Sequence, residues 1–144
     1  MTNDTGLQVM TLPADISQLK KALEFIRTIA ERAGCPHEIE QSIEIASEEI
    51  FVNIASYAYP KTEAGEVRIG CKVERNVKNS KFLVVFTDRG KQYNPLEHPD
   101  PDITVPIDER PIGGLGLLMV KRMMDTVQYK HSNGWNHLII IKSW

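Results

Sequence analysis

The chain has 144 residues, of which 42% are hydrophobic and 25% charged, and its formal net charge is −2. These totals fit a single globular domain over residues 1–144 and give no electrostatic footprint for nucleic acid. The longest apolar runs, residues 82–86 and 138–141, are too short to cross a membrane. The two cysteines and four histidines follow no metal-binding spacing, so we expect reduced thiols and a cytoplasmic location.

The first half of the chain predicts one strand followed by two helices. Residues 7–12 alternate weakly, as a short strand does. Asp15 and Gln18 resemble a capping box, and apolar residues at helical spacing continue to Gly34, which is expected to end the helix. A second helix is expected from Pro36, with a buried face opposite a solvated acidic row. The buried face comprises Ile39, Ile43, Ala46, Ile50, Asn53 and Tyr57, and the acidic row comprises Glu40, Glu44 and Glu48.

The second half predicts four strands, a long proline-rich loop and a third helix. Residues 66–74 alternate as a half-buried strand does, and the apolar run 82–87 is typical of a strand buried on both faces. Asn133-Gly134 is a strong hairpin signal between two further strands, residues 127–131 and 135–142. This order favours an α+β two-layer sandwich, in which a mixed, mainly antiparallel sheet is covered on one face by three helices.

Three glycines precede the third predicted helix. Gly113, Gly114 and Gly116 would let the backbone approach a ligand closely, and the free N–H groups at a helix start suit an anion such as phosphate. A hinge ahead of a surface helix is equally compatible with this pattern. The segment is not a Walker motif, because no Lys-Ser or Lys-Thr follows Gly116, and it is a poor dinucleotide fingerprint because Met119 replaces the third small residue.

Two further polar sites could carry chemistry. Asn53 lies on the apolar stripe of the second helix and Glu49 one turn earlier lies beside it, so an amide and a carboxylate point together into the interior. They could tie the helix to a loop, or they could offer an oxygen ligand to Mg²⁺ and a proton acceptor to a hydroxyl. Asp88 ends a buried strand ahead of Gly90, and it could bind an amino group beside a flat ring or be an ordinary turn aspartate.

Taken in this order, the segments resemble one protein family closely. The matching segments are an N box, Glu49-x-x-x-Asn53, a first glycine box, Asp88-x-Gly90-x-x-Tyr93-Asn94-Pro95, and a second glycine box, Gly113-Gly114-Leu115-Gly116-Leu117. The family is the ATPase superfamily that includes gyrase and the histidine kinases. Within it, the small size and the wording of the boxes resemble the bacterial anti-sigma-factor serine/threonine kinases.

The resemblance implies a Bergerat-type ATP-binding fold and a role for each matching residue. Asn53 would coordinate Mg²⁺ and Glu49 would be the general base. Asp88 would bind the adenine amino group, with Gly90 in the floor of the pocket. The phosphates would lie against the second glycine box, and residues 96–112 would form a lid over ATP. By its position and charge, Arg110 could reach the γ-phosphate from this lid or be a solvated lid charge.

The resemblance also implies an activity and partners. The γ-phosphoryl group of ATP would pass to a serine or threonine of an anti-anti-sigma antagonist, and the protein would hold a sigma factor and form a homodimer. Three alternatives stay open: an ATP-binding switch without kinase activity, a free-standing ATPase, and a protein that binds no nucleotide. The chain departs from the family at Tyr57, because many members carry a histidine four residues after the N-box asparagine.

Overall fold

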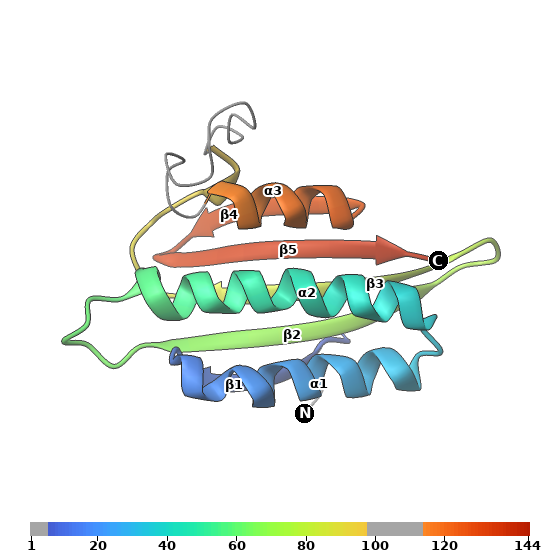
Figure 1. Ribbon diagram of the computed structural model, residues 1–144, viewed down its shortest axis with the longest axis horizontal. Helices are drawn as coiled ribbons and strands as arrows, with labels where there is room; N and C mark the ends of the chain where they lie inside the picture. The colour runs from blue at the N-terminus through green and yellow to red at the C-terminus, as the bar shows by residue number, and fades with distance from the viewer. Residues whose placement is uncertain (1–5, 98–113) are drawn as a thin grey trace.

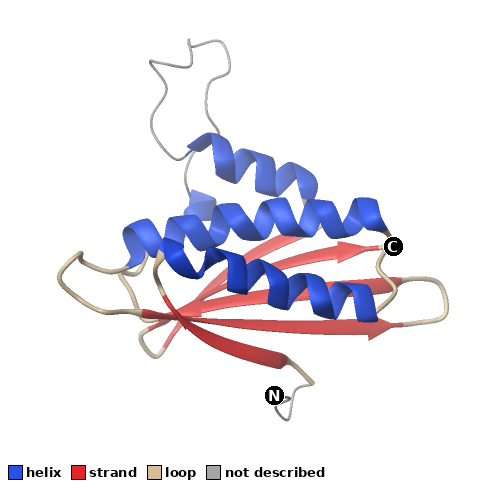
Figure 2. Ribbon diagram, turned by 60° about the horizontal axis from the view of Figure 1, so that its bottom comes forward, coloured by secondary structure: helices blue, strands red, loops and turns tan. Residues whose placement is uncertain are grey.

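The computed structural model describes residues 6–97 and 114–144 of the chain, and residues 1–5 and 98–113 lie outside the description. The described chain is a five-stranded sheet with helices on one face (Figures 1 and 2). Its long elements are β1 (Gln8–Pro13), α1 (Leu19–Arg32), α2 (His37–Asn53), β2 (Glu66–Arg75), β3 (Ser80–Asp88), α3 (Gly114–Met123), β4 (Thr126–Ser132) and β5 (Trp135–Ser143). Its short helical turns are Ile16–Gln18, Ile54–Ala58 and Pro95–Glu97.

The strands lie in the order β1-β2-β3-β5-β4, and each neighbouring pair of these described strands is antiparallel. Val84 at the centre pairs with Cys71 of β2 and with Ile140 of β5. The β4–β5 turn is tight, because Asn133 and Gly134 have positive φ values of 54° and 84°, as the primed hairpin turns require. The two-layer α+β fold and this hairpin are therefore confirmed.

The core lies between the sheet and the helices. Every second residue of β3 is buried against the helices, and these residues are Phe82, Val84 and Phe86. Leu83 and Val85 point to the other face and are only half-buried, so the prediction that this strand is buried on both faces was wrong. The physical reason is that all three long helices lie on the same side of the sheet and leave its other face uncovered (Figure 2).

The acidic row predicted for α2 was also wrong at Glu40, which is only 8% exposed. The first turn of α2 lies against the last turns of α1, and burial raises the pKa of the Glu40 carboxyl, with the Glu31 and Glu44 carboxylates adding to the rise. At the other end of α2, Tyr57 is 65% exposed rather than buried. The α-helix ends at Asn53, and the π-helical turn that follows carries Tyr57 away from the apolar stripe.

Both cysteine thiols are free. Cys71 is buried in the core, and burial raises its pKa, while burial and the neighbouring Glu40 carboxylate raise the pKa of Cys35 to about 11. Neither thiol is therefore activated as a nucleophile at neutral pH. None of the helices in the described ranges is both long enough and apolar enough to span a membrane.

Candidate functional site

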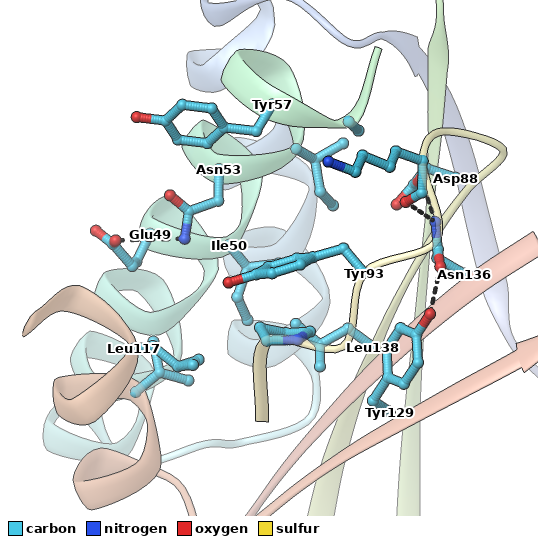
Figure 3. Close-up of a pocket in the computed structure, with 15 residues that line it drawn as sticks. Glu49, Ile50, Asn53, Tyr57, Asp88, Tyr93, Leu117, Tyr129, Asn136 and Leu138 are labelled. Atoms are coloured by element: carbon cyan, nitrogen blue, oxygen red, sulfur yellow. Dashed lines mark hydrogen bonds between the residues drawn. The ribbon is translucent and has the colours of Figure 1, made fainter. Parts of the chain in front are cut away.

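A cavity of about 320 Å³ opens between α2, the first turns of α3 and the sheet beneath them (Figure 3). Glu49 and Asn53 of α2, Asp88 of β3 and Leu117 of α3 all line it. Apolar side chains from α2 and β5, including Ile50 and Leu138, form much of the rest of its wall. A mainly apolar cleft of this size with a few convergent polar groups is typical of a small-molecule site.

Glu49 and Asn53 lie one helical turn apart and both face this cavity. The Asn53 side-chain amide donates a hydrogen bond of 3.5 Å to Glu49 Oε1, and both side chains are half-buried. The Asn53 amide oxygen accepts no hydrogen bond from the residues that the structure describes. The pair therefore presents carboxylate and amide oxygens at one end of the cavity, where Figure 3 shows them opposite Asp88.

The second glycine box reaches the same end of the cavity through α3. A Cβ atom built on Gly116 would lie only 1.9 Å from Glu49 Oε1, so the carboxylate occupies the space that any side chain at this position would need. The helix begins at Gly114, so Gly114, Leu115 and Gly116 form its first turn. Gly113 and residues 98–112 of the predicted lid, Arg110 among them, lie outside the described residues.

The opposite end of the cavity is built around Asp88, the last residue of β3, which is 5% exposed. Its Oδ1 atom accepts hydrogen bonds from the Gly90 backbone N–H at 2.8 Å and from the Asn136 side-chain amide at 3.0 Å. No described residue donates to its Oδ2 atom. A carboxylate oxygen has no hydrogen to donate and can only accept a hydrogen bond, so this end of the cavity suits a ligand N–H group.

Asn136 of β5 is a site residue that the sequence analysis missed. It is 6% exposed, and besides Asp88 its amide donates to the backbone oxygens of Lys91 at 3.0 Å and Gly90 at 3.3 Å. Its own oxygen accepts a hydrogen bond from the Tyr129 hydroxyl. Its position in the sequence could have revealed it. Side chains alternate along β5, and Asn136 lies on the core-facing side with Leu138 and Ile140, where a polar residue needs a buried partner.

The turn after Asp88 is also held from the outside, by the segment that follows α2. The Tyr59 hydroxyl donates to the Glu66 backbone oxygen at 2.6 Å and accepts the Arg89 backbone N–H at 2.9 Å. The Lys91 backbone N–H donates to the Ala58 backbone oxygen at 2.8 Å. With the Gly90 N–H on Asp88, three consecutive backbone donors of this turn are satisfied, which fixes its conformation.

Gly90 is required at its position in this turn. A Cβ atom there would lie 2.2 Å from the Ala58 backbone oxygen, which is far inside any normal contact. Gly65 plays a similar part for Tyr59, since a Cβ atom on Gly65 would lie 2.1 Å from the tyrosine ring. Two glycines therefore let the chain after α2 pack directly against the Asp88 turn.

Two further tyrosines line the cavity. Figure 3 shows the Tyr93 ring reaching between the Glu49–Asn53 pair and the Asp88–Asn136 pair, and burial raises the pKa of its phenol. Tyr57 lies on the α2 side, and its 65% exposure places it at the rim. The departure from the family pattern at Tyr57 therefore changes the edge of the cavity and leaves its polar groups intact.

Comparison with known families agrees with this geometry. The family described as the histidine kinase-like ATPase domain matches residues 12–142. The chain belongs to this family. That match spans all three long helices, strands β2, β3 and β4 and nearly all of β5 of this ATPase domain, including both ends of the cavity, and it begins near the end of β1. The resemblance that the sequence motifs indicated is thereby confirmed.

Two of the relatives that the chain resembles are named as protein kinases. The ATPase domain is 24% identical over 119 residues to the serine/threonine-protein kinase BtrW of Bordetella bronchiseptica, covering 83% of this chain and 81% of that protein. It is 25% identical over 134 residues to the serine-protein kinase RsbW of Oceanobacillus iheyensis, covering 87% and 79% respectively.

A solved structure shares the fold. The crystal structure of the RsbU and RsbW domains of Rv1364c from Mycobacterium tuberculosis superposes with a TM-score of 0.63 at 17% identity. The superposition covers 96% of this chain and spans 33% of that larger one. The likeness supports the two-layer architecture described above.

Proposed function

We propose that this chain is an ATP- and Mg²⁺-dependent serine/threonine-protein kinase of the anti-sigma-factor type, built as one domain. The observation that carries the proposal is the arrangement of one cavity. A carboxylate and an amide, Glu49 and Asn53, face the first turn of a glycine-started helix at one end, and a buried acceptor, Asp88, lies at the other. Similarity to proteins named serine-protein kinase RsbW and serine/threonine-protein kinase BtrW supports it.

The residues at each end fit ATP. Asp88 Oδ2 is the acceptor for the adenine amino group, and the apolar wall around Leu138 and Ile50 takes the flat faces of the ring. Gly90 keeps the floor of this end free of a side chain. The phosphates would lie at the first turn of α3, where Gly114, Leu115 and Gly116, preceded by Gly113, offer backbone N–H groups and the positive end of the helix dipole.

A magnesium ion fits only as a partner of the phosphates. The described residues contain no group of three or more acidic, histidine or cysteine side chains that could enclose a metal. Asn53 Oδ1 is a suitable oxygen ligand, and Mg²⁺ commonly completes its shell with water and substrate phosphate oxygens. Asn53 would therefore hold the ion only when the nucleotide is also present.

Glu49 is the proposed general base. ATP supplies the γ-phosphoryl group, and Glu49 would accept the proton of the partner's serine or threonine hydroxyl as that oxygen bonds to the γ-phosphorus and the bond to ADP breaks. The Asn53 amide holds Glu49 Oε1 at 3.5 Å and orients the carboxylate. The glycine at position 116 leaves the carboxylate room beside the phosphate end.

The proposed partners follow the related proteins. We propose an anti-anti-sigma antagonist as the phosphorylated protein, a sigma factor as the second protein that is held, and a homodimer as the working form in the cytoplasm. The name RsbW among the relatives and the RsbW domain of the structural neighbour support the antagonist.

Transfer of radiolabel from [γ-³²P]ATP to a candidate antagonist tests the proposal. Glu49→Gln should abolish labelling of the antagonist while ATP still binds, because the amide cannot accept the proton. The matched control is Glu48→Gln, which makes the same change at the exposed neighbouring residue on α2. This variant should label the antagonist at the rate of the unmodified protein. ATP binding without labelling of any antagonist would show a switch module instead. Rapid turnover without a partner would show a free-standing ATPase.

A further inference from the structure

The helices leave one face of the sheet uncovered (Figure 2), and this face carries more basic than acidic side chains. Alternation and strand register place on it the side chains of Arg68, Lys72, Lys81 and Lys130, joined by Arg89 from the turn after β3, and the carboxylates of Glu66 and Glu74. The chain as a whole has a net charge of −2. The uncovered face is therefore positive on an otherwise acidic protein.

The cations gather around one aromatic residue at the end of the face nearest Asp88. The Arg68 and Arg89 guanidinium carbons lie 5.3 and 4.8 Å from the centre of the Trp135 ring. Lys130 pairs in register with His137, whose Nδ1 atom lies 3.2 Å from the Thr87 hydroxyl. We call Arg68, Arg89, Lys130, Trp135 and His137 the Trp135 cluster.

The cations of the Trp135 cluster are not neutralised within the described structure. Arg68, Arg89 and Lys130 form no ion pair with any acidic residue in the described ranges, whereas Lys72 pairs with Glu74 at 3.6 Å. Guanidinium groups that stack on an aromatic ring keep their N–H edges free for carboxylates, which they bind in a two-pronged geometry. The cluster is thus prepared to receive anionic groups.

An aliphatic strip continues from the Trp135 cluster across the same face. Val85 pairs with Ile139 on one side and with Gly70 on the other, and Gly70 pairs with Val9. The strip consists of Val9, Leu83, Val85, Ile139 and Ile141, all half-buried, and Leu83 and Ile141 are partners in register. The face therefore joins a cationic-aromatic end to an apolar middle.

We propose that this uncovered face docks an acidic, amphipathic segment of a partner protein, with carboxylates on the Trp135 cluster and apolar side chains on the aliphatic strip. A second copy of this chain is a poorer occupant, because packing the face on itself opposes two surfaces that both carry a net positive charge. A nucleic acid is also a poorer occupant, because its backbone would leave the strip without an apolar partner. Charge and apolar pattern together select the acidic segment.

Docking here leaves the nucleotide cavity accessible. Thr87 and Asp88 are consecutive residues of β3 whose side chains point to opposite faces, Thr87 toward His137 and Asp88 toward Asn136. The cavity and the uncovered face are therefore separated by the thickness of the sheet. ATP affinity and segment binding can be measured independently, so a failure of one leaves the other intact.

The test uses the full chain and a fluorescein-labelled peptide with glutamates on one side and leucines on the other, followed by fluorescence anisotropy. Arg68→Glu combined with Lys130→Glu should weaken peptide binding about tenfold or more, since two attractive charges become repulsive. The matched control, Lys20→Glu with Lys21→Glu, makes the same charge change on exposed positions of α1 and should bind the peptide like the unmodified protein.

Further probes distinguish the occupants. The same peptide with glutamine in place of glutamate should bind at least about tenfold more weakly, and neither duplex DNA nor phosphatidylglycerol vesicles should bind more tightly than the acidic peptide. Equal binding by both double variants would overturn the proposal. Tighter binding of DNA or vesicles that is lost in the Arg68→Glu, Lys130→Glu protein would overturn the choice of partner. Concentration-dependent self-association lost in the same variant would identify a second copy instead. Circular dichroism and ATP affinity report whether each variant is folded.

Discussion

Replacing Asn136 with leucine should both destabilise the protein and weaken nucleotide binding, because this buried amide holds the turn that carries Asp88. Leucine has a similar branched shape but makes none of the four hydrogen bonds of the Asn136 side chain. The Gly90 and Lys91 backbone oxygens lose their donor, and water has little access to a site that is 6% exposed. With about 1 kcal/mol for each bond and some compensation by water, the unfolding free energy should fall by about 2–4 kcal/mol.

The assay is urea unfolding without nucleotide, which should show the loss directly, and thermal unfolding, which should show a midpoint lowered by about 5–12 °C. Gln128→Leu removes an amide from an exposed position on β4 and should change stability by less than about 0.5 kcal/mol.

Ligand binding gives a second readout. Asn136→Leu should weaken the binding of adenosine and of ATP by the same factor, about tenfold. The reason is that Asp88 loses the Asn136 donor that positions it, so its hydrogen bond to the ligand is misplaced. Asn53→Ala should weaken ATP with Mg²⁺ and leave adenosine unchanged. An Asn136→Leu protein with stability and adenosine affinity like those of the unmodified chain would refute the reasoning about this turn.

Three further substitutions test other parts of the structure. Ser47→Ala should leave stability unchanged or raise it by about 1 kcal/mol in urea unfolding, because the Ser47 hydroxyl is fully buried without a hydrogen-bond partner in the described structure. Gly116→Ala should lower phosphoryl transfer more than tenfold, about 1.4 kcal/mol of barrier, while adenosine binding is unchanged, since the new Cβ atom would overlap Glu49 Oε1. The folded state raises the pKa of Glu40, so this group favours folding most below its unfolded pKa and loses that contribution as pH rises through the folded value. Glu40→Gln should therefore raise the urea midpoint at neutral pH, with a gain that shrinks as pH falls below about 4.

Local patterns in the sequence predicted much of the fold. Strand alternation, the Asn133-Gly134 turn and the helical spacing of Glu49 and Asn53 each depend on residues close together in the chain. Because such signals are local, they indicate which side chains share a face only within a regular helix or strand, and the π-helical turn after Asn53 removes Tyr57 from its predicted face. They also placed the glycine-started helix, whose contact with Glu49 then followed from packing.

The features that the sequence did not reveal depend on distant partners. Asn136 reads as an ordinary polar residue until its partner Asp88, 48 positions earlier, is brought beside it. Tyr59 holds the Asp88 turn only because the backbone N–H of Arg89, 30 positions later, donates a hydrogen bond to its hydroxyl. Glu40 was assigned to solvent because helical periodicity alone does not report that α1 covers the first turn of α2.

The two ends of the cavity are held by different physical means, and this difference has a consequence for binding. At the Asp88 end, the turn is fixed before any ligand arrives, because its backbone N–H groups donate to the Tyr59 hydroxyl and the Ala58 backbone oxygen and its Lys91 oxygen accepts from the Asn136 amide. At the other end, one 3.5 Å contact and the close packing of Gly116 position Glu49. A preformed end loses little freedom on binding, so the proposed adenine end should supply affinity that hardly varies among adenine nucleotides. Discrimination between ATP and ADP must then arise at the Glu49 end, where the terminal phosphate and its ion would be placed.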